Sequence, residues 1–469
     1  MLILNQNTMK KSDITQFILS YGLHLIIGLG LIIRLTFYIS LEPWNENLID
    51  KTLNMSDEIE YHNVALDLEQ KRSFENFSSF RTPLYTLFVA LTYGLTNNSI
   101  ATVLFIQILM NLLSVYLVYR IANEIFTHKI ALLSALLFAV DPLQIIYSIQ
   151  LLTDVMFVFL FLFSIYFLCK YFKTNTIKTL SLSALFLGLA TLTRPITFLF
   201  PFLSIILLLL FHKTSLTYKL KHAALFGFVF IISISPWLSH NYCKYGVAKL
   251  SSISGYNLLI FNVASTEAYK TQKPIAEVQK YFNYLAIQRG SDSTALNPSN
   301  KEPFKNSDIY TGIAKEYIKD NFLLYIKRNI IGIAYMYVAV PTGLITTNFN
   351  IQSKYHSEHY AGAKFSGGFK YLGFFNKMSL VELIITVSMF LFLFLIYVFS
   401  FLKVLNPGRK RDSWFYILLF VLIILYFSAL TGVVGASRYR LPIMPFLYIL
   451  SAAGFSFFTI KNKLFSERE

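Results

Sequence analysis

Apolar segments of about twenty residues recur along this chain, and they constrain its fold more than any other feature. A helix needs ~20 apolar residues to cross ~30 Å of hydrocarbon. Only 14% of the 469 residues are charged, whereas soluble domains have roughly 25%. The sequence therefore predicts an all-α polytopic membrane protein. Ten segments reach or approach the required length: 16–40, 99–122, 130–148, 152–171, 179–193, 196–211, 219–238, 381–404, 413–432 and 441–459.

Two further apolar segments, 82–95 and 326–345, are short or amphipathic. Cytoplasmic loops carry an excess of Lys and Arg, so loop charge discriminates between ten and twelve crossings. With twelve crossings, the eight basic residues of the turns between 120 and 221 would face outward. We therefore expect about ten spanning helices with both ends in the cytoplasm, and we keep twelve as the alternative. The two doubtful segments should then lie along the outer interface.

The net charge of +16 does not indicate a nucleic-acid partner. Its basic residues recur in short turns between apolar segments rather than in one stripe, as membrane anchors do. The first apolar run, 17–41, is longer than the ~7–15 apolar residues of a signal peptide, which predicts a retained helix. The two cysteines, Cys169 and Cys243, fall on opposite faces of this topology, so we expect no disulfide between them.

Two large loops are predicted on the noncytoplasmic side, at 42–98 and about 239–380. The second contains amphipathic stretches with one apolar helical face each. We expect its second stretch to place Ile313 and Tyr317 against the bilayer. The chain thus divides into a transmembrane catalytic module (1–245), a large loop with amphipathic helices (246–380) and C-terminal transmembrane helices (381–469). The apolar faces consist of Ile275, Val278, Phe282 and Leu285, and of Ile313, Tyr317, Phe322 and Tyr325.

An acidic pair, Asp57 and Glu58, lies in the first loop, and Asp154 opens a later apolar segment. A carboxylate beside a low-dielectric surface can have its pKa raised, which suits a general base. The alternative for the pair is a helix start with Ser56 as N-cap. The alternative for Asp154 is a favourable position beside a helix dipole.

Several arginines stand at predicted helix ends on the noncytoplasmic side. Arg81 precedes Thr82 and Pro83, which have the types expected of an N-cap and a first helical residue. A cation at this electropositive end makes sense if an anion binds there. Arg194 joins two apolar runs and is either an anion ligand or a side chain that extends to the interface. Arg34, in the outer part of the first segment, leaves the same two readings open.

The last apolar segment is preceded by "SRYRLP", which places Arg438 and Arg440 on the side that is otherwise poor in positive charge. The positive-inside rule does not explain arginines on that side. They are the residue type expected to bind an anion. A carboxylate and several cations on one membrane face fit a substrate with a lipid tail and a phosphate head. A sugar joined to a lipid phosphate leaves readily when cations neutralise the phosphate, and the transfer then needs one base for the acceptor.

Six motifs, in this order, resemble GT-C fold glycosyltransferases. The resemblance is to the dolichyl-phosphate-mannose–protein mannosyltransferase-like group, and the bacterial lipid A aminoarabinose transferases belong to the same broader set. The motifs are "DEIEYHNVALDL", "FRTPLYTLFVALTYGL", "DPLQIIYSIQLLTDVMF", "LFLGLATLTRPITFLFP", "SPWLSHNYCKYG" and "SRYRLPIMPFLYIL". After "PW", members of this group often have Arg-Asn, whereas this chain has His240 and Asn241, which puts a cation there in doubt.

The resemblance implies an inverting transfer of a sugar from a polyprenyl-phosphate carrier to a protein, lipid or glycan acceptor. It also implies an integral protein of the bacterial inner membrane whose active site faces outward. Asp57 would activate the acceptor, with Glu58 as the adjacent substitute. The site residues expected are Asp57, Glu58 and Asp154 as catalytic groups; Arg81, Arg194, Arg438 and Arg440 as phosphate ligands; and Tyr61, Tyr439 and His240 elsewhere in the pocket.

Some relatives bind a divalent metal ion near the active site, but no ligand cluster in this sequence indicates one. Two other functions fit many helices and phosphate-binding arginines. A transporter or flippase of a lipid-linked sugar would place its polar groups near the midplane, often in repeated helices, and here the charged candidates lie at helix ends. A polysaccharide ligase or polymerase that uses an undecaprenyl-diphosphate donor differs from the first reading only through the motif set.

Overall fold

The computed structural model describes residues 11–72, 77, 79–292, 302–349, 378–407 and 411–466, and regular structure within those ranges is helical throughout. The elements before residue 246 are α1 (Lys11–Leu41), η1 (Glu46–Leu48), α2 (Ile49–Thr52), α3 (Ser56–Lys71), α4 (Leu84–Thr96), α5 (Ile100–Ile125), α6 (His128–Ala139), α7 (Pro142–Tyr147), α8 (Asp154–Thr174), α9 (Ile177–Thr193), η2 (Pro195–Thr197), α10 (Phe200–Phe211) and α11 (Leu216–Tyr245). After it come α12 (Ile253–Tyr256), η3 (Asn257–Val263), α13 (Ala264–Thr271), α14 (Ile275–Gln288), α15 (Pro303–Asp320), α16 (Phe322–Val338), α17 (Thr342–Asn348), α20 (Leu380–Leu405), α21 (Arg411–Ala429), η4 (Ser437–Arg440) and α22 (Met444–Ser466).

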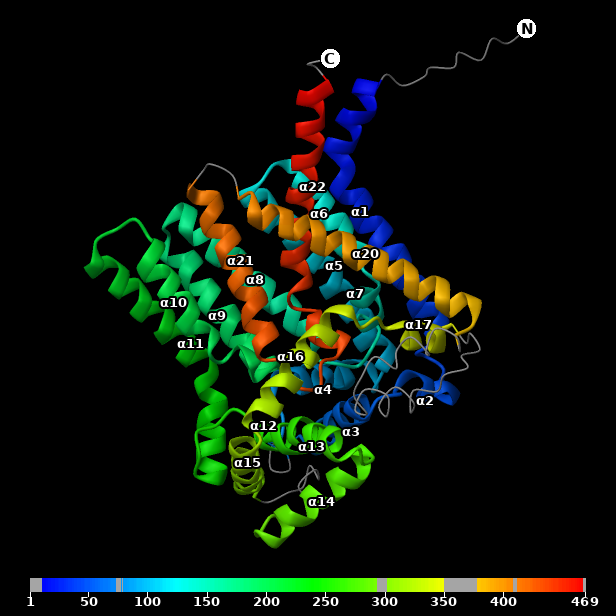
Figure 1. Ribbon diagram of the computed structural model, residues 1–469, viewed down its shortest axis with the longest axis vertical. Coiled ribbons are helices and arrows are strands. Elements are labelled where there is room, and N and C mark those ends of the chain that lie inside the picture. The colour runs from blue at the N-terminus through cyan, green and yellow to red at the C-terminus, as the bar shows by residue number, and fades with distance from the viewer. Residues whose placement is uncertain are drawn as a thin grey trace.

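Every one of the ten predicted segments contains a helix, and the all-α membrane fold is confirmed. Within the described ranges, five helices are long and apolar enough to cross a bilayer, namely Ser20–Leu41 within α1, α5, α8, α11 and α20. The pair α16 and α17, bent by 45°, adds a sixth if it is one span, and six shorter apolar helices accompany them. The chain is an integral membrane protein. Figure 1 shows that α1 begins and α22 ends at one end of the molecule, whereas α13, α14 and α15 lie at the other.

One predicted segment, 130–148, is broken into α6 and α7. The break has a local cause. Asp141 caps α7 by accepting a hydrogen bond from the Leu143 backbone N–H at 2.9 Å, and Pro142 occupies the first turn. Proline fits the first turn of a helix but not its interior. The segment 82–95 forms α4, whose 13 residues span ~20 Å, less than the ~30 Å of hydrocarbon.

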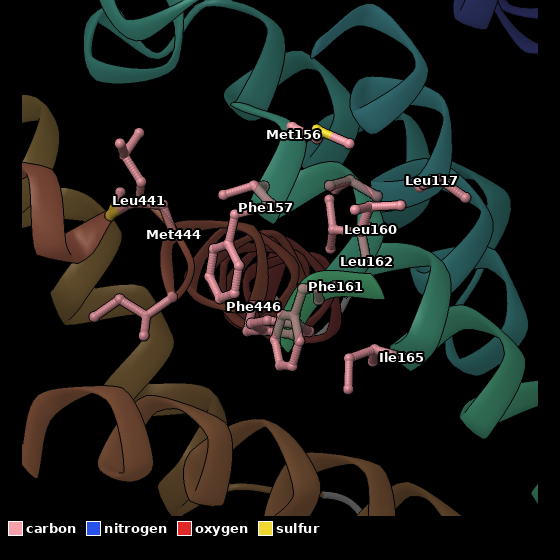
Figure 2. Close-up of a cluster of buried hydrophobic side chains, with 14 of the residues drawn as sticks. Leu117, Met156, Phe157, Leu160, Phe161, Leu162, Ile165, Leu441, Met444 and Phe446 are labelled. Carbon is pink, nitrogen blue, oxygen red and sulfur yellow. The ribbon is translucent and has the colours of Figure 1, made fainter. Parts of the chain in front are cut away.

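The core of the bundle surrounds α8. A helix that is apolar all round is buried on all sides, and α8 has buried residues around its whole circumference. Phe161 packs edge-on against Phe427 of α21 and Phe446 of α22, with ring centroids 5.2 and 6.2 Å apart. Figure 2 shows Phe157 and Phe161 beside Phe446. This packing fixes the start of α8, where Asp154 lies, against the segment that carries Arg438.

A second, smaller core belongs to η3, α13, α14 and α15, which we call the loop unit. Val278 and Phe282 of α14 pack with Ile313 of α15 and with Leu259 of η3. The sequence correctly grouped the apolar residues of α14, but the second predicted face is divided between α15 and α16, and its predicted partner was wrong. Ile313 is buried inside the protein, and Tyr317 donates a hydrogen bond to Glu267 at 2.7 Å, because α13 and α14 cover the face expected to meet the bilayer. Residues 350–377 of the same predicted loop lie outside the described residues.

Arg34 neither extends to the interface nor reaches a cleft. Its side chain is fully buried. Its Nε and Nη2 donate to Asn111 Oδ1 at 2.8 and 2.6 Å, and its Nη1 donates to the Ala139 carbonyl oxygen at 2.8 Å. Both sequence interpretations of Arg34 are therefore corrected, because α5 supplies an internal partner that spacing along α1 could not reveal. Cys169 and Cys243 are both free.

Candidate active site

Helix α3 contributes one face to a large cavity. Asp57, Glu60, Tyr61 and Val64 all line it. Their spacing of three and four residues places them on one side of a helix. The helix begins at Ser56, so the alternative reading of the acidic pair was right about a helix start, but the N-cap is Met55 and not Ser56. A helix start and a cavity-lining role for Asp57 are therefore compatible.

Glu58 points the other way, because adjacent residues of a helix do not share a face. Its side chain is fully buried, and its two oxygens accept hydrogen bonds from the Met55 and Leu151 backbone N–H groups at 2.9 and 3.2 Å. Burial raises the pKa of Glu58 to about 7, against the opposing effect of those hydrogen bonds. The structure does not bring Glu58 to the cavity, so it is not placed to substitute for Asp57.

Arg81 binds the α3 face. Its Nη2 lies 2.8 Å from Asp57 Oδ1 and 2.6 Å from Glu60 Oε2. The guanidinium also stands over the Tyr61 ring, 4.9 Å from the centroid. Thr82 is buried and donates to the Thr193 carbonyl oxygen at 3.0 Å, which ties the start of α4 to the end of α9. The Arg-Thr-Pro motif thus joins the first loop to the bundle.

Asp154, the first residue of α8, connects the two remaining cavity arginines. One of its oxygens accepts from Arg194 Nη1, and the other accepts from Arg438 Nε at 2.8 Å. Arg194 follows the last residue of α9, where extended backbone and Pro195 turn the chain. Asp154 is only 1% exposed and is not part of the cavity lining, whereas Arg194 and Arg438 line it.

Arg438 closes the chain of contacts, because its Nη1 lies 2.9 Å from Asp57 Oδ2. Side chains separated by up to 381 residues in sequence thus form one arginine–carboxylate network. Its order is Glu60–Arg81–Asp57–Arg438–Asp154–Arg194. Three carboxylates alternate with three guanidinium groups, so the network is close to neutral as a whole.

The network sets the protonation of its members. Burial raises the pKa of Asp57, but the charges of Arg81 and Arg438 outweigh it and bring that pKa to about 2. Burial lowers the pKa of Arg438, but Asp154 and Asp57 raise it well above its ordinary value. Asp57 and Arg438 are therefore both charged at neutral pH. Asp57 holds a guanidinium on each oxygen, which leaves it a weak base in this state.

The cavity has a volume of about 1230 Å³ and lies between the bundle and the loop unit. One wall carries the network. Another part of the lining, which we call the loop wall, consists of neutral polar and apolar side chains plus Lys249, whose Nζ contacts both oxygens of Asp308 at 2.6 and 2.9 Å. The loop wall is formed by Ala248, Lys249, Leu250, Ser251, Ile253, Ser254, Tyr256, Asn257, Phe261 and Asn262.

The predicted site residues are not all brought together. Asp57, Arg81, Arg194, Arg438, Tyr61 and Tyr439 line the cavity. Arg440 does not, although it is two residues from Arg438. Its Nη1 donates to the carbonyl oxygens of Met336 and Tyr337 at 2.7 and 2.8 Å, so it stabilises the end of α16. His240 stacks on Trp237 at 4.9 Å and is likewise absent from the lining.

Sequence reasoning missed Glu60 and Asn262. Glu60 had a readable signal, since it is three residues after Asp57 on one predicted helix, and the adjacent Glu58 was chosen instead. Asn262 had none, because its role depends on contact with a segment 171 residues away. Among the described residues, no group of three or more His, Cys, Asp or Glu side chains is placed to hold a metal ion. The cavity carboxylates bind arginines instead.

Comparison with known proteins gives a consistent picture. Residues 81–240 match the model of a family described as dolichyl-phosphate-mannose-protein mannosyltransferase. The structure resembles the archaeal oligosaccharyltransferase AglB from Archaeoglobus fulgidus, solved with an inhibitory peptide and a dolichol-phosphate, with a TM-score of 0.53 and 13% sequence identity over 97% of this chain. The chain has the GT-C fold. The resemblance inferred from the six motifs is thereby confirmed.

This GT-C chain spans about half of AglB, since the alignment covers 52% of that protein. The apo form of the Archaeoglobus fulgidus oligosaccharyltransferase gives a TM-score of 0.50 at 12% identity, over 95% of this chain and 52% of that one. ArnT from Cupriavidus metallidurans bound to undecaprenyl phosphate is 13% identical over 92% of this chain and 78% of its own, at a TM-score of 0.39. No curated protein matches the chain in sequence.

Proposed function

We propose that this chain is a membrane glycosyltransferase that moves a sugar from a polyprenyl-phosphate carrier to an acceptor, with inversion at the sugar carbon. The observation that supports this most is the arrangement of three arginines and three carboxylates beside one large cavity. The cavity volume of about 1230 Å³ exceeds the roughly 300–1,000 Å³ of sites for a single small ligand. It has room for a donor headgroup and an acceptor together.

In this proposal, Arg81 and Arg438 bind the donor phosphate, and Arg194 assists from the far side of Asp154. Guanidinium groups bind phosphate through paired, charge-assisted hydrogen bonds. Each of these arginines now holds a carboxylate, which a phosphate can replace. The lipid phosphate is also the leaving group, so cations that neutralise it lower the barrier to departure.

Asp57 is the proposed base. The acceptor oxygen attacks the first carbon of the sugar, the bond from that carbon to the phosphate oxygen breaks, and Asp57 takes the acceptor proton. With both oxygens bound to arginines, its pKa is about 2. A donor phosphate that draws Arg81 and Arg438 away removes the charges that depress this pKa. Binding of the donor therefore turns Asp57 into a stronger base at the moment when it is needed.

The acceptor is proposed to lie against the loop wall. Ser251, Ser254 and Asn257 present hydroxyl and amide groups there, and Tyr256 and Phe261 present rings. These groups suit an acceptor rich in hydroxyl groups. We propose that the site faces outward from a bacterial inner membrane, since α3 and α12, which line the cavity, lie toward the end of the molecule opposite the start of α1 (Figure 1). Whether the acceptor is a glycan, a lipid or a protein is determined by identifying the glycosylated product of the transfer reaction.

The first test is Asp57→Asn. It keeps the shape of the side chain and removes the base, so transfer should fall at least about 10³-fold, within the range for loss of a general base and its electrostatics. Sugar transfer is followed by mass spectrometry of surface glycans and lipids in cells lacking the gene and carrying each variant. The matched control is Asp67→Asn, a partly exposed carboxylate of the same helix that pairs with Lys71 and does not line the cavity. Full transfer by Asp57→Asn would remove Asp57 from the mechanism.

A further inference from the structure

The segment that leads into η4 is held between two other parts of the chain. Gly432 and Gly435 have positive φ angles of 73° and 49°, a conformation that side chains other than glycine rarely adopt. A Cβ on Gly432 would lie 2.5 Å from Asn262 Oδ1, and a Cβ on Gly435 would strike the Gly332 carbonyl oxygen of α16. Residues 432–435 are therefore packed tightly on both sides, and Arg438 follows three residues later.

Asn262 makes a side-chain hydrogen bond to this segment. Its Oδ1 accepts from the Val433 backbone N–H at 2.8 Å, and its Nδ2 donates to the Asn257 carbonyl oxygen at 3.0 Å. Both ends of the amide are thus used, and the contact joins residues 171 apart in sequence. The bond fixes the orientation of the amide as well as its position.

Asn262 lies in η3, a seven-residue π-helix. Such helices are rare and occur frequently at functional sites, because the extra residue per turn shifts the direction of the side chains that follow. Asn262 lines the cavity, and so do Thr431 and Val434 on either side of its bonded partner. The π-helix thus brings the loop unit into contact with the backbone segment that precedes Arg438.

We propose that Asn262 is a positioning residue for Arg438, through which the loop unit sets the geometry of the donor-phosphate site. This inference rests on the function proposed above. Arg438 must point its guanidinium between Asp57 and Asp154, and its backbone has little regular structure of its own to hold it there. The four-residue η4, which contains Arg438, begins two residues after the tightly packed segment 432–435. Loss of the Asn262 contact lets residues 432–435 shift, which displaces Arg438 from the phosphate.

The test compares two lipids that differ only in charge, undecaprenyl phosphate and undecaprenol. Binding of each to the purified full chain in detergent is measured for the unaltered protein and for Asn262→Ala. Affinity for undecaprenyl phosphate should fall about tenfold, equivalent to ~1.4 kcal/mol, while affinity for undecaprenol stays unchanged. A role limited to stability would reduce both affinities together or neither. Asn283→Ala is the matched control, since Asn283 accepts one hydrogen bond from Tyr310 in the same loop unit.

Gly432→Ala disturbs the same contact, because the new Cβ would lie against Asn262 Oδ1. It should also weaken the binding of undecaprenyl phosphate and leave the binding of undecaprenol unchanged. Because Asn262→Ala removes the atom that the new Cβ strikes, the double variant should lose less affinity than the sum of the two single losses. Equal phosphate affinity in Asn262→Ala and the unaltered protein, or fully additive losses, would overturn the inference. An unaltered protein that binds both lipids equally would instead overturn the proposed function.

Discussion

The arginines of two regions of this protein, the cavity and the interior of the bundle, have different partners. In the cavity, Arg81, Arg194 and Arg438 bind carboxylates. In the interior of the helix bundle, Arg34 binds the side-chain amide oxygen of Asn111 and the carbonyl oxygen of Ala139. A carboxylate is an anion that another anion can replace. A carbonyl oxygen is part of the backbone and stays. The comparison teaches that two properties together mark an arginine as available to a ligand: a carboxylate partner, and a side chain that is 17–20% exposed in the cavity rather than fully buried like that of Arg34.

Arg440 shows how local this distinction is. It lies two residues from Arg438 in the same short helix, yet its guanidinium binds backbone carbonyl oxygens at the end of α16. Residue type and position along the chain are almost the same for the two. The contacts made by neighbouring elements separate them.

The largest effect that sharpens this comparison is expected from Arg438→Met. The variant removes one phosphate ligand and leaves Asp57 and Asp154 without one of their cations, so affinity for undecaprenyl phosphate should fall roughly 100-fold. Binding to purified protein in detergent measures it. Arg120→Met is the matched control, because Arg120 donates to the hydroxyl groups of Tyr116 and Tyr166, outside the cavity. A change of less than about twofold in Arg438→Met would break the comparison.

Arg34→Met should give the converse result. Asn111 Oδ1 and the Ala139 carbonyl oxygen lose their donor inside the bundle, which costs about 2 kcal/mol of stability. Affinity for undecaprenyl phosphate should stay within about twofold of the unaltered protein once folding is accounted for. Thermal unfolding and lipid binding on the same preparation separate the two quantities. A selective loss of phosphate binding at unchanged stability would place Arg34 with the cavity arginines.

The smallest expected effect is on the pH dependence of stability, and it concerns the two neighbouring acids of α3, Asp57 and Glu58. Burial raises the pKa of Glu58 to about 7 from an ordinary value of 4.5, so the folded protein holds this proton more tightly than the unfolded chain. The stability contributed by Glu58 is therefore full below pH 4.5 and is lost as the pH rises through 7. Glu58→Gln should reduce the change in the free energy of unfolding between about pH 5 and 8 by roughly 1–2 kcal/mol, which is measured as a flatter dependence of the melting temperature on pH.

Asp57 gives the opposite sign, since its pKa is lowered to about 2 and its contribution is lost only as the pH falls toward that value. Asp57→Asn should therefore leave the curve between about pH 5 and 8 unchanged, which makes it the control for Glu58→Gln. Parallel melting curves for Glu58→Gln and the unaltered protein would contradict the burial of a titrating carboxyl group there.

Several parts of the site could be read from the sequence because they depend on local pattern. The Arg-Thr-Pro motif, the arginine after α9 and the arginine before α22 stand at helix ends, and apolar periodicity reveals those ends. Glu60 was also readable from its spacing to Asp57. The placement of Glu58 depends on which face of α3 meets the bundle, and that of Arg440 on the end of α16. Both placements depend on contacts with segments that lie far from Glu58 and Arg440 in the sequence.

The sequence by itself determined an apolar, helical membrane protein with acids and arginines at helix ends, because hydrocarbon demands long apolar helices and expels unpaired charge to their termini. The tertiary structure alone decided which arginines meet carboxylates and which meet carbonyl oxygens. It also decided that the loop unit holds the segment before Arg438. Ion pairs act over a few ångströms, so only the packing of distant segments determines which charges come within that range.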